Sequence, residues 1–166
     1  MDAAHFRTFA RYNAWANRRL YDACATLDAA EYLKRRAAFF GSIHNTLNHL
    51  LVADRIWLAR IERKEHGIKS LDQVLYDDLA TLRAAREAED AHICALTDGL
   101  DAAALMNTWS YSNMAGTPQE TRLDWILSHL FNHQTHHRGQ VHDTLSQTST
   151  APPPLDLLYF LRAPND

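Results

Sequence analysis

The sequence predicts an all-α protein, built as a four-helix bundle with short accessory helices and loops. Its apolar residues recur at helical spacing along several long stretches, whereas strands would require alternation. Only five glycines and five prolines occur in 166 residues, and they punctuate these stretches. Four long helices that each have one apolar face bury these faces best by packing around a common axis. We expect one domain that spans residues 1–166. A three-helix bundle with accessory pieces is the second choice.

The first helix is expected from about Ala3 to Leu27, with Asp2 as a suitable N-cap residue. Its apolar side includes Phe6, Phe9 and Leu20, which recur at helical intervals. The residues Asp28-Ala29-Ala30-Glu31 that follow have the pattern of a short capped helix.

Two further long helices are expected in the middle of the chain. Ser42 is the cap of one that runs to about Glu65, and Gly67 lies where a helix-ending residue with left-handed backbone is expected. Ser70-Leu71-Asp72-Gln73 is another start signal, and a third long helix is expected from about Tyr76 to Leu96.

The stretch from Thr97 to Gly116 is less regular, and Thr108 to Asn113 could be extended chain. Thr117-Pro118-Gln119-Glu120 combines a capping box with proline at the first helical position, so a fourth long helix is expected from there to about Ser146. Three consecutive prolines then prevent any helix from continuing. The short apolar tail from Leu155 to Leu161 is expected to pack back on the bundle.

The composition argues against several classes of protein. A formal net charge of −3 offers no basic surface for nucleic acid or for an anionic membrane. Apolar runs such as Leu50–Ala53 are far shorter than the roughly 20 residues that span a bilayer, and the start of the chain lacks the features of a signal peptide. Cys24 and Cys94 form no Cys-x-x-Cys pair or dense cysteine pattern, so we expect each to be a small core residue in a reducing compartment. We therefore expect a cytoplasmic protein that binds neither nucleic acid nor membranes.

Histidines are concentrated near the C-terminal end, where five of the ten fall between His129 and His142. His133 and His137 are four residues apart, so they project from one helix face about 40° apart and can share a metal ion. His129 precedes them by another four residues, and spacing alone does not decide which neighbouring pair chelates. Isolated histidines in helices are usually surface or hydrogen-bonded residues, and we interpret four in this way: His5, His66, His92 and His142.

Two ligands on one helix hold a metal weakly, and catalytic zinc sites generally take a third from elsewhere. His49 is the best candidate, because it lies in the middle of the second long helix among apolar residues. His44 and Asp54 are the alternatives.

Four segments resemble the DinB family, in the same order and over nearly the whole chain. They are Tyr12-Asn13-Ala14-Trp15-Ala16-Asn17 followed by Leu20, Gly41-Ser42-Ile43, the run from Ile43 to Leu58 around His49, and Leu130-Phe131-Asn132-His133-Gln134-Thr135-His136-His137-Arg138-Gly139-Gln140. The resemblance implies a four-helix bundle of the DinB/YfiT type, commonly a homodimer. It also implies that one divalent metal ion is bound by His49, His133 and His137, with His129 and His136 as neighbours rather than ligands.

Relatives in that family include transferases and isomerases that activate a low-molecular-weight thiol at the metal, although many members look like proteins without a known reaction. Three neutral imidazoles leave the ion its full charge, so it can activate either a thiol or water. Gln134 follows His133 where His-Glu-x-x-His hydrolases carry their general base, which favours thiol transfer to a small-molecule substrate over hydrolysis. A non-catalytic, metal-bearing dimeric scaffold or sensor is the alternative. Imidazole suits zinc, nickel, iron, cobalt and copper alike, so the ligands do not specify the metal; zinc or nickel is expected first, with iron, manganese or cobalt as further options.

Ligand histidines usually donate their second ring N–H to a carboxylate or carbonyl, and Asp54, Asp143 and Asp124 are candidates for that role. Asp54 lies about 140° around its helix from His49, so pairing with Arg138 is its more plausible role. Arg138 could alternatively hold an anionic thiol or be a solvated surface residue. Aromatic residues at helical spacing are usually core residues, but three could line a substrate pocket: Tyr12, Trp15 and Trp57.

Overall fold

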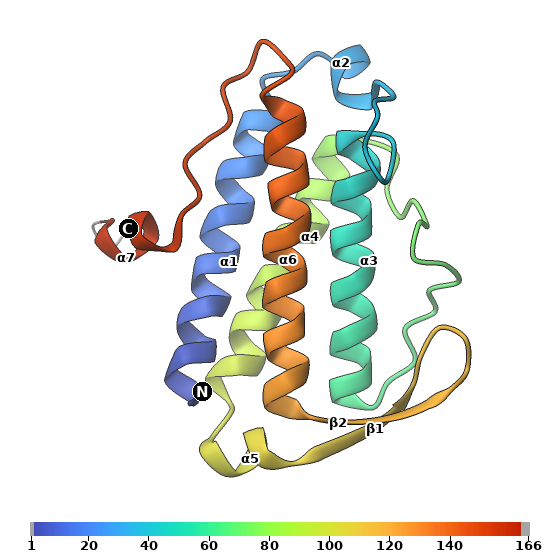
Figure 1. Cartoon of the computed structure of the whole chain (residues 1–166), viewed down its shortest axis with the longest axis vertical. Coiled ribbons are helices and arrows are strands. Elements are labelled where there is room, and N and C mark those ends of the chain that lie inside the picture. Colours follow the sequence, from blue (N-terminus) through green and yellow to red (C-terminus); the bar gives the residue numbers. More distant parts are fainter. Residues whose placement is uncertain (1, 164–166) are drawn as a thin grey trace.

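The computed structural model describes residues 2–163 and has four long helices packed side by side (Figure 1). These are α1 (Ala3–Cys24), α3 (Ile43–Glu62), α4 (Leu79–Asp98) and α6 (Leu123–Leu145). Helix α1 packs mainly against α4, and α3 packs mainly against α6, while α1–α6 and α3–α4 contacts close the bundle. The all-α prediction is confirmed. No helix in the described part of the chain is long and apolar enough to cross a membrane.

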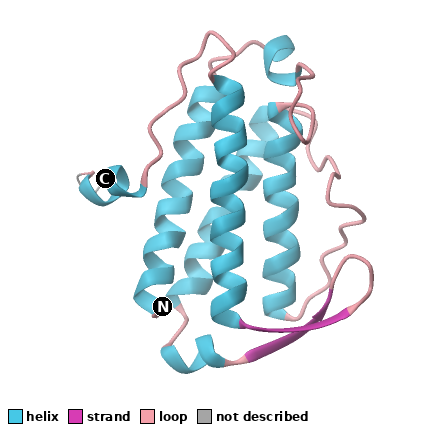
Figure 2. Cartoon of the chain, in the orientation of Figure 1, coloured by secondary structure: helices cyan, strands magenta, loops and turns pink. Residues whose placement is uncertain are grey.

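Short accessory elements lie at the two ends of the bundle and along its side (Figure 2). They are α2 (Ala29–Leu33), α5 (Ala102–Met106), β1 (Thr108–Ser112), β2 (Pro118–Arg122) and α7 (Leu157–Arg162). Strands β1 and β2 form an antiparallel hairpin, so the extended chain expected in this region is confirmed.

Helix starts are set by the predicted caps at three places. Asp2 accepts a hydrogen bond from the backbone N–H of His5 over 2.8 Å, and Asp28 accepts one from Glu31 over 2.8 Å. Ser42 Oγ accepts from the backbone N–H of Asn45 over 3.0 Å. Each side chain satisfies a backbone donor that has no partner within its own helix.

The predicted start of the fourth long helix is wrong. Residues 118–122 form strand β2 instead, and α6 begins at Leu123. The turn before the strand is made by Gly116, whose φ of 80° is left-handed, and by Asn113, whose side chain accepts from two backbone N–H groups. Pro118 lies at the end of the ladder, where a missing N–H is tolerated. Pairing with β1 therefore overrides a local helix-start signal.

The segment between α3 and α4 also differs from the prediction. Helix α3 ends at Glu62, and the left-handed residue that ends it is Arg63, with φ of 58°, rather than Gly67. Residues 70–73 form no helix, and α4 begins later, where Asp78 caps it by accepting from the backbone N–H of Thr81 over 2.9 Å. The residues between the two helices are left as irregular chain that runs along the bundle (Figure 1).

The C-terminal tail returns to the bundle as expected. Tyr12 Oη donates to the backbone carbonyl of Leu155 over 2.8 Å. The ring of Phe160 lies 6.0 Å from the ring of Tyr12 and 5.8 Å from that of Trp15. Tyr12 and Trp15 therefore support the tail.

Candidate metal centre

Three histidines meet between α3 and α6, near the middle of both helices. His49 Nε2 lies 3.1 Å from His133 Nε2, and the ring of His137 is centred 4.6 Å from that of His49 and 4.3 Å from that of His133. One ring nitrogen from each residue lies within 4.8 Å of the other two. His49 and His137 are buried, and His133 is half-buried. The structure thus brings together the three residues that the sequence singles out.

The outer nitrogens of two of these rings are held by acceptors. His49 Nδ1 lies 2.7 Å from the backbone carbonyl oxygen of Leu71, which can only accept, so Nδ1 carries the proton. His137 Nδ1 lies 2.7 Å from Gln140 Oε1, which also accepts, so Nδ1 of His137 carries the proton as well. In a neutral imidazole the other nitrogen, Nε2, then carries a lone pair instead of a proton. Both lone pairs are available to a metal ion in the centre of the cluster.

The loop that supplies the Leu71 carbonyl is fixed to α3 by Asn48, the neighbour of His49. Asn48 Oδ1 accepts hydrogen bonds from the backbone N–H groups of Leu75 and Tyr76, over 2.8 and 3.1 Å. This explains why residues 70–73 do not extend α4: their backbone lies along α3, where the Leu71 carbonyl contacts His49.

All three imidazoles are neutral at neutral pH. Burial, reinforced by the nearby rings of His137 and His49, lowers the pKa of His133 to about 3. Burial also lowers the pKa values of His49 and His137, against the hydrogen bonds to Leu71 and Gln140 that raise them. Metal ions bind the neutral form of imidazole, so no proton has to be displaced at neutral pH.

Phe40 covers one side of the cluster. Its ring is stacked on that of His49, with centroids 4.0 Å apart and planes inclined by 23°, and its centroid lies 5.5 Å from that of His137. Gly41 allows this approach, because its φ of 80° turns the chain sharply before α3 begins. Sequence reasoning missed Phe40, because nothing in its local pattern indicates a distant contact.

A cavity of about 450 Å³ adjoins the cluster and is bordered by His49 and His133. Most of its other walls are apolar and come from α3, from the loop after it and from the β1–β2 turn. Trp57 and His129 also line it, with rings 5.1 Å apart. Of the three aromatic residues that were candidates for a substrate pocket, Trp57 alone contributes to this cavity.

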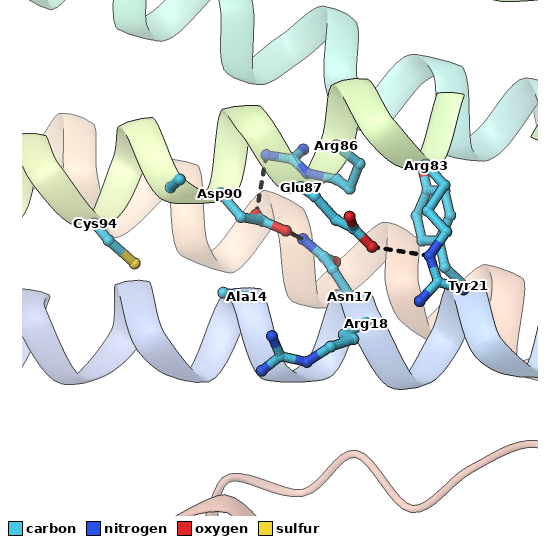
Figure 3. Close-up of a pocket in the computed structure, with 10 residues that line it drawn as sticks. Ala14, Asn17, Arg18, Tyr21, Arg83, Arg86, Glu87, Asp90 and Cys94 are labelled. Carbon is cyan, nitrogen blue, oxygen red and sulfur yellow. Dashed lines mark hydrogen bonds and ion pairs between the residues drawn. The ribbon is translucent and has the colours of Figure 1, made fainter. Parts of the chain in front are cut away.

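A smaller cavity, of about 240 Å³, lies between α1 and α4 (Figure 3). Asn17, Tyr21, Arg86 and Asp90 contribute to its walls. None of the three clustered histidines borders it, so of these two cavities the larger one adjoins the cluster.

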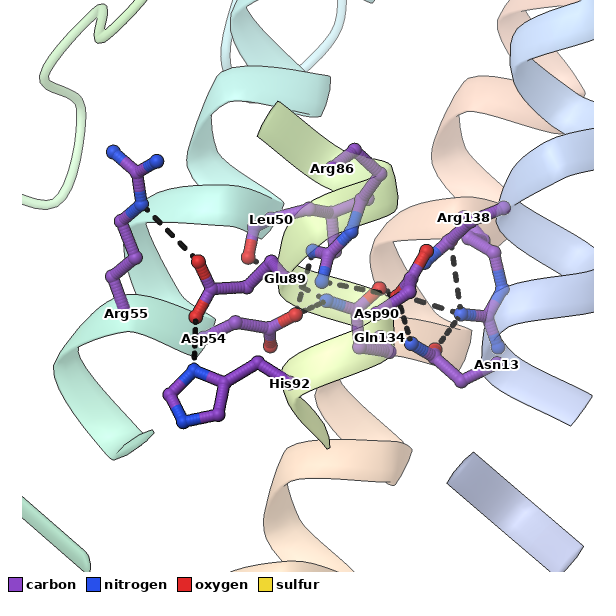
Figure 4. Close-up of polar contacts among 11 residues, drawn as sticks. Asn13, Leu50, Asp54, Arg55, Arg86, Glu89, Asp90, His92, Gln134 and Arg138 are labelled. Atoms are coloured by element: carbon purple, nitrogen blue, oxygen red, sulfur yellow. Dashed lines mark hydrogen bonds and ion pairs between the residues drawn. The ribbon is translucent and has the colours of Figure 1, made fainter. Parts of the chain in front are cut away.

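The expected pairing of Asp54 with Arg138 is wrong. Asp54 Oδ2 accepts from Arg86 Nη1 over 2.6 Å and from Gln134 Nε2 over 2.5 Å (Figure 4). Arg138 donates to the amide oxygens of Asn13, Asn17 and Gln134 instead. Only 3% of Arg138 is exposed, so it is neither a surface residue nor available to an anionic thiol.

The proposed carboxylate partners of the ligands are also wrong. Asp124 accepts from Arg122, and Asp143 from Gln147, and neither contacts a clustered histidine. His44 lies outside the cluster, where its ring bonds Tyr32 and Asn48. The acceptors that the structure provides are the Leu71 carbonyl and Gln140. Gln140 lies three residues after His137, one helical turn away, which is the one signal that could have identified it.

Comparison with known proteins assigns the sequence to a family. The sequence model of the DinB family matches residues 1–166. The chain belongs to the DinB family. Protein DinB of Bacillus subtilis (strain 168) is 24% identical to it over 163 residues, which cover 90% of each chain. The resemblance found in the sequence is therefore confirmed, and the match of this DinB-family chain includes both helices that carry the clustered histidines.

Proposed function

We propose that this DinB-family protein binds one divalent metal ion through His49, His133 and His137 and uses it to activate a low-molecular-weight thiol for transfer to a small electrophilic molecule. The observation that carries the proposal is the pair of outer hydrogen bonds, from His49 Nδ1 to Leu71 and from His137 Nδ1 to Gln140. Metal-binding histidines in proteins are oriented in the same way.

The donor set fits a small divalent ion. With metal–nitrogen distances of about 2.0–2.1 Å, two ligands of a tetrahedral ion lie about 3.3 Å apart. The 3.1 Å between His49 Nε2 and His133 Nε2 is close to that value, so binding needs little movement of either helix. Zinc and nickel are our first choices, with iron, manganese and cobalt as further options.

An incomplete donor set favours catalysis over a purely structural role. Within residues 2–163, the group that could hold a metal consists of three histidines, with no fourth side-chain ligand. Structural zinc sites are usually closed by four protein ligands, whereas catalytic sites keep a position open. The adjoining cavity gives a small molecule access to that position.

A divalent ion at this site would lower the pKa of a thiol or of water toward neutrality. The chain supplies the surroundings: Phe40 packs on one side, and the mostly apolar walls of the cavity lie on the other. Among the described residues, no Asp or Glu lines the cavity, and Gln134 is fully buried against Asp54, so this part of the chain offers no carboxylate general base there. This supports thiol transfer over hydrolysis, in which His129 would have to act as the base.

Metal analysis of protein purified without a histidine tag tests the site. We expect about one equivalent of metal in the wild type and a large loss in His49→Ala and His137→Ala. His92→Ala is the matched control, because its ring lies on the surface between Glu62 and Glu89. A wild type that stays empty after reconstitution, or variants that keep their metal, would refute the proposal.

Assays of the loaded protein with and without a thiol test the reaction. Turnover of an aryl halide that needs both thiol and metal is the expected result. Metal-dependent ester hydrolysis without thiol would instead favour the hydrolase, and inactivity in both assays would favour a non-catalytic scaffold or sensor. We further propose a homodimer, on the basis of the family resemblance, and a monomer in sedimentation equilibrium would contradict it.

A further inference from the structure

One face of α3 connects the histidine cluster to a cationic side chain. His49, Ala53, Trp57 and Arg60 all border the cavity, and their spacing of four, four and three residues places them along one helix face. At 1.5 Å per residue, the α-carbons of His49 and Arg60 lie about 16 Å apart along the axis. Helical side chains lean toward the N-terminus, so the guanidinium lies closer to the cluster than its α-carbon does. The cavity thus has the metal site at one end and a fixed positive charge at the other.

Three contacts orient the guanidinium of Arg60. Its Cζ lies 4.7 Å from the ring centre of Trp57 and 4.9 Å from that of Tyr111. Its Nη2 donates to the backbone carbonyl of Ser112 over 2.9 Å. These contacts fix the plane of the group, and a fixed guanidinium loses little freedom when it binds a ligand.

The charge of Arg60 is not balanced by a carboxylate. Among the residues that the structure describes, no Asp or Glu forms an ion pair with it, and its one hydrogen-bond acceptor is the neutral Ser112 carbonyl. Two other arginines of the bundle differ in this respect: Arg86 pairs with Asp54 and Asp90, and Arg55 pairs with Glu89. Arg60 therefore presents a free positive charge beside a mostly apolar cavity.

An alternative role for Arg60 is to hold the β1–β2 hairpin on α3. That role would explain its contacts with the aromatic rings of Trp57 and Tyr111, but nothing more. That role would not require Arg60 to border the same cavity as His49 and His133. A planar guanidinium with free N–H groups matches a carboxylate, which it binds through two parallel hydrogen bonds. Apolar walls between the two ends favour a hydrocarbon or aryl body.

We propose that this cavity binds an elongated organic acid, with its carboxylate at Arg60, its apolar body against Ile56 and Trp57, and its reacting group at the histidine cluster. The inference rests on the proposed function, because it names the substrate class of the same site. It adds a specificity residue that lies far from the metal.

Binding of thiol probes to the cobalt(II)-loaded protein tests the inference. Thiol coordination to cobalt produces a near-ultraviolet absorption band, which gives a dissociation constant without any turnover. We expect ω-mercaptooctanoate to bind about tenfold more tightly than ω-mercaptooctanol, because only the acid can form two charge-assisted hydrogen bonds with Arg60. Arg60→Gln should abolish that preference and leave the affinity for the alcohol unchanged. Mercaptopropionate is too short to reach Arg60, so its affinity should not respond to the substitution.

Arg63→Gln is the matched control, because it removes the same charge from the exposed end of α3 without touching the cavity. It should keep the tenfold preference. Arg60→Lys retains the positive charge and should keep part of the preference, which provides a second test if Arg60→Gln does not fold. Equal binding of acid and alcohol by the wild type, or a preference that survives in Arg60→Gln, would overturn the inference.

Failure of the proposed function gives a different result. If no thiol changes the cobalt spectrum, thiol activation is refuted, and octanoate binding to the metal-free protein then tests the cavity by itself. Octanoate that binds more tightly than octanol, with the difference lost in Arg60→Gln, would still support the organic-acid site. Absence of that difference would overturn it.

Discussion

Gln134 on α6 donates a hydrogen bond from Nε2 to Oδ2 of Asp54 on α3, over 2.5 Å. This bond links the helix of His133 and His137 to the helix of His49, one residue after His133 and five residues after His49. Gln134 is fully buried and Asp54 is 1% exposed, so the bond is shielded from water. Buried polar groups of this kind specify how helices align, because a shift of one helix would leave them without partners.

The bond belongs to a larger buried network that joins all four long helices (Figure 4). Its charges balance, because Arg86 and Arg138 face Asp54 and Asp90. Asn13 and Asn17 on α1 each donate to Asp90 over 3.0 Å. The Arg86 and Asp90 side chains that border the smaller cavity in Figure 3 are therefore part of the bundle's internal framework.

Removing one charge from this network should strongly destabilise the fold. Asp54→Asn leaves Arg86, which is 1% exposed, with only Asp90 as an anionic partner. Breaking a buried ion pair in this way costs about 3–5 kcal/mol. Urea unfolding of the metal-free protein would measure the loss. Asp98→Asn is the control, because its ion pair with Arg11 is about half exposed and such pairs contribute about 1 kcal/mol or less. Similar losses in the two variants would contradict the argument.

The sequence was sufficient to predict the features that depend on local spacing. The caps at Asp2, Asp28 and Ser42 act within one turn of their own helix, and His133 and His137 share a face because they are four residues apart. His49 required more, because its position opposite the pair depends on how α3 and α6 align. Its apolar surroundings made it the best candidate, with His44 and Asp54 as alternatives, and the family resemblance selected it before the structure did.

Features that depend on tertiary contacts could not be predicted in this way. A backbone carbonyl such as that of Leu71 has no sequence signature, since every residue carries one. Asp54 and Arg138 lie on neighbouring helices, but Arg86 on α4 takes the position of the expected partner. Pro118 resembled a helix start because the competing strand pairing joins residues six to fourteen positions apart in the chain, beyond a local capping pattern.

The acceptor behind His137 should determine part of the metal affinity. Gln140→Leu removes the hydrogen bond to Nδ1, so the ring loses both its orientation and part of its basicity. Losing such a partner typically weakens metal binding by about 10- to 100-fold. Competition with a chromophoric zinc chelator would measure the change. Gln147→Leu, at the exposed end beyond α6, should bind zinc as the wild type does. Equal zinc affinity of the wild type and Gln140→Leu would show that this bond does not support the site.

Cys24 should be chemically inert in the folded protein. Its side chain is completely buried, and burial raises the pKa of its thiol from an ordinary value of 9.0 to about 12. A disulfide reagent at pH 8 should therefore leave Cys24 unmodified until urea unfolds the protein. Rapid modification of native Cys24, identified by mass spectrometry, would contradict its placement in the core. Cys94 is half-buried and should react before Cys24 does.

The same pKa shift gives a pH dependence with a definite sign. Above pH 9 the unfolded chain releases the Cys24 proton while the folded chain retains it, so stability falls as pH rises toward 12. At pH 10 the loss from this residue is about 1.4 kcal/mol relative to neutral pH. Cys24→Ala should lack this contribution, so its unfolding free energy should decline less between pH 8 and pH 10. Parallel declines in the two proteins would argue against the shift.

Substitutions at two adjacent phenylalanines test whether Phe40 shields the histidine cluster or only contributes apolar packing. Phe40 packs on His49 and His137, whereas Phe39 is 84% exposed. Phe40→Ala should lower the unfolding free energy by about 2 kcal/mol, which is less than the loss for a fully buried phenylalanine. Phe39→Ala should lower it by about 0.5 kcal/mol or less. Phe40→Ala should also accelerate zinc loss to a chelator, because water then reaches the ligands from a second side. If both variants released zinc at the wild-type rate, Phe40 would be a packing residue alone, and access to the metal would be controlled from the side of Trp57 and Arg60.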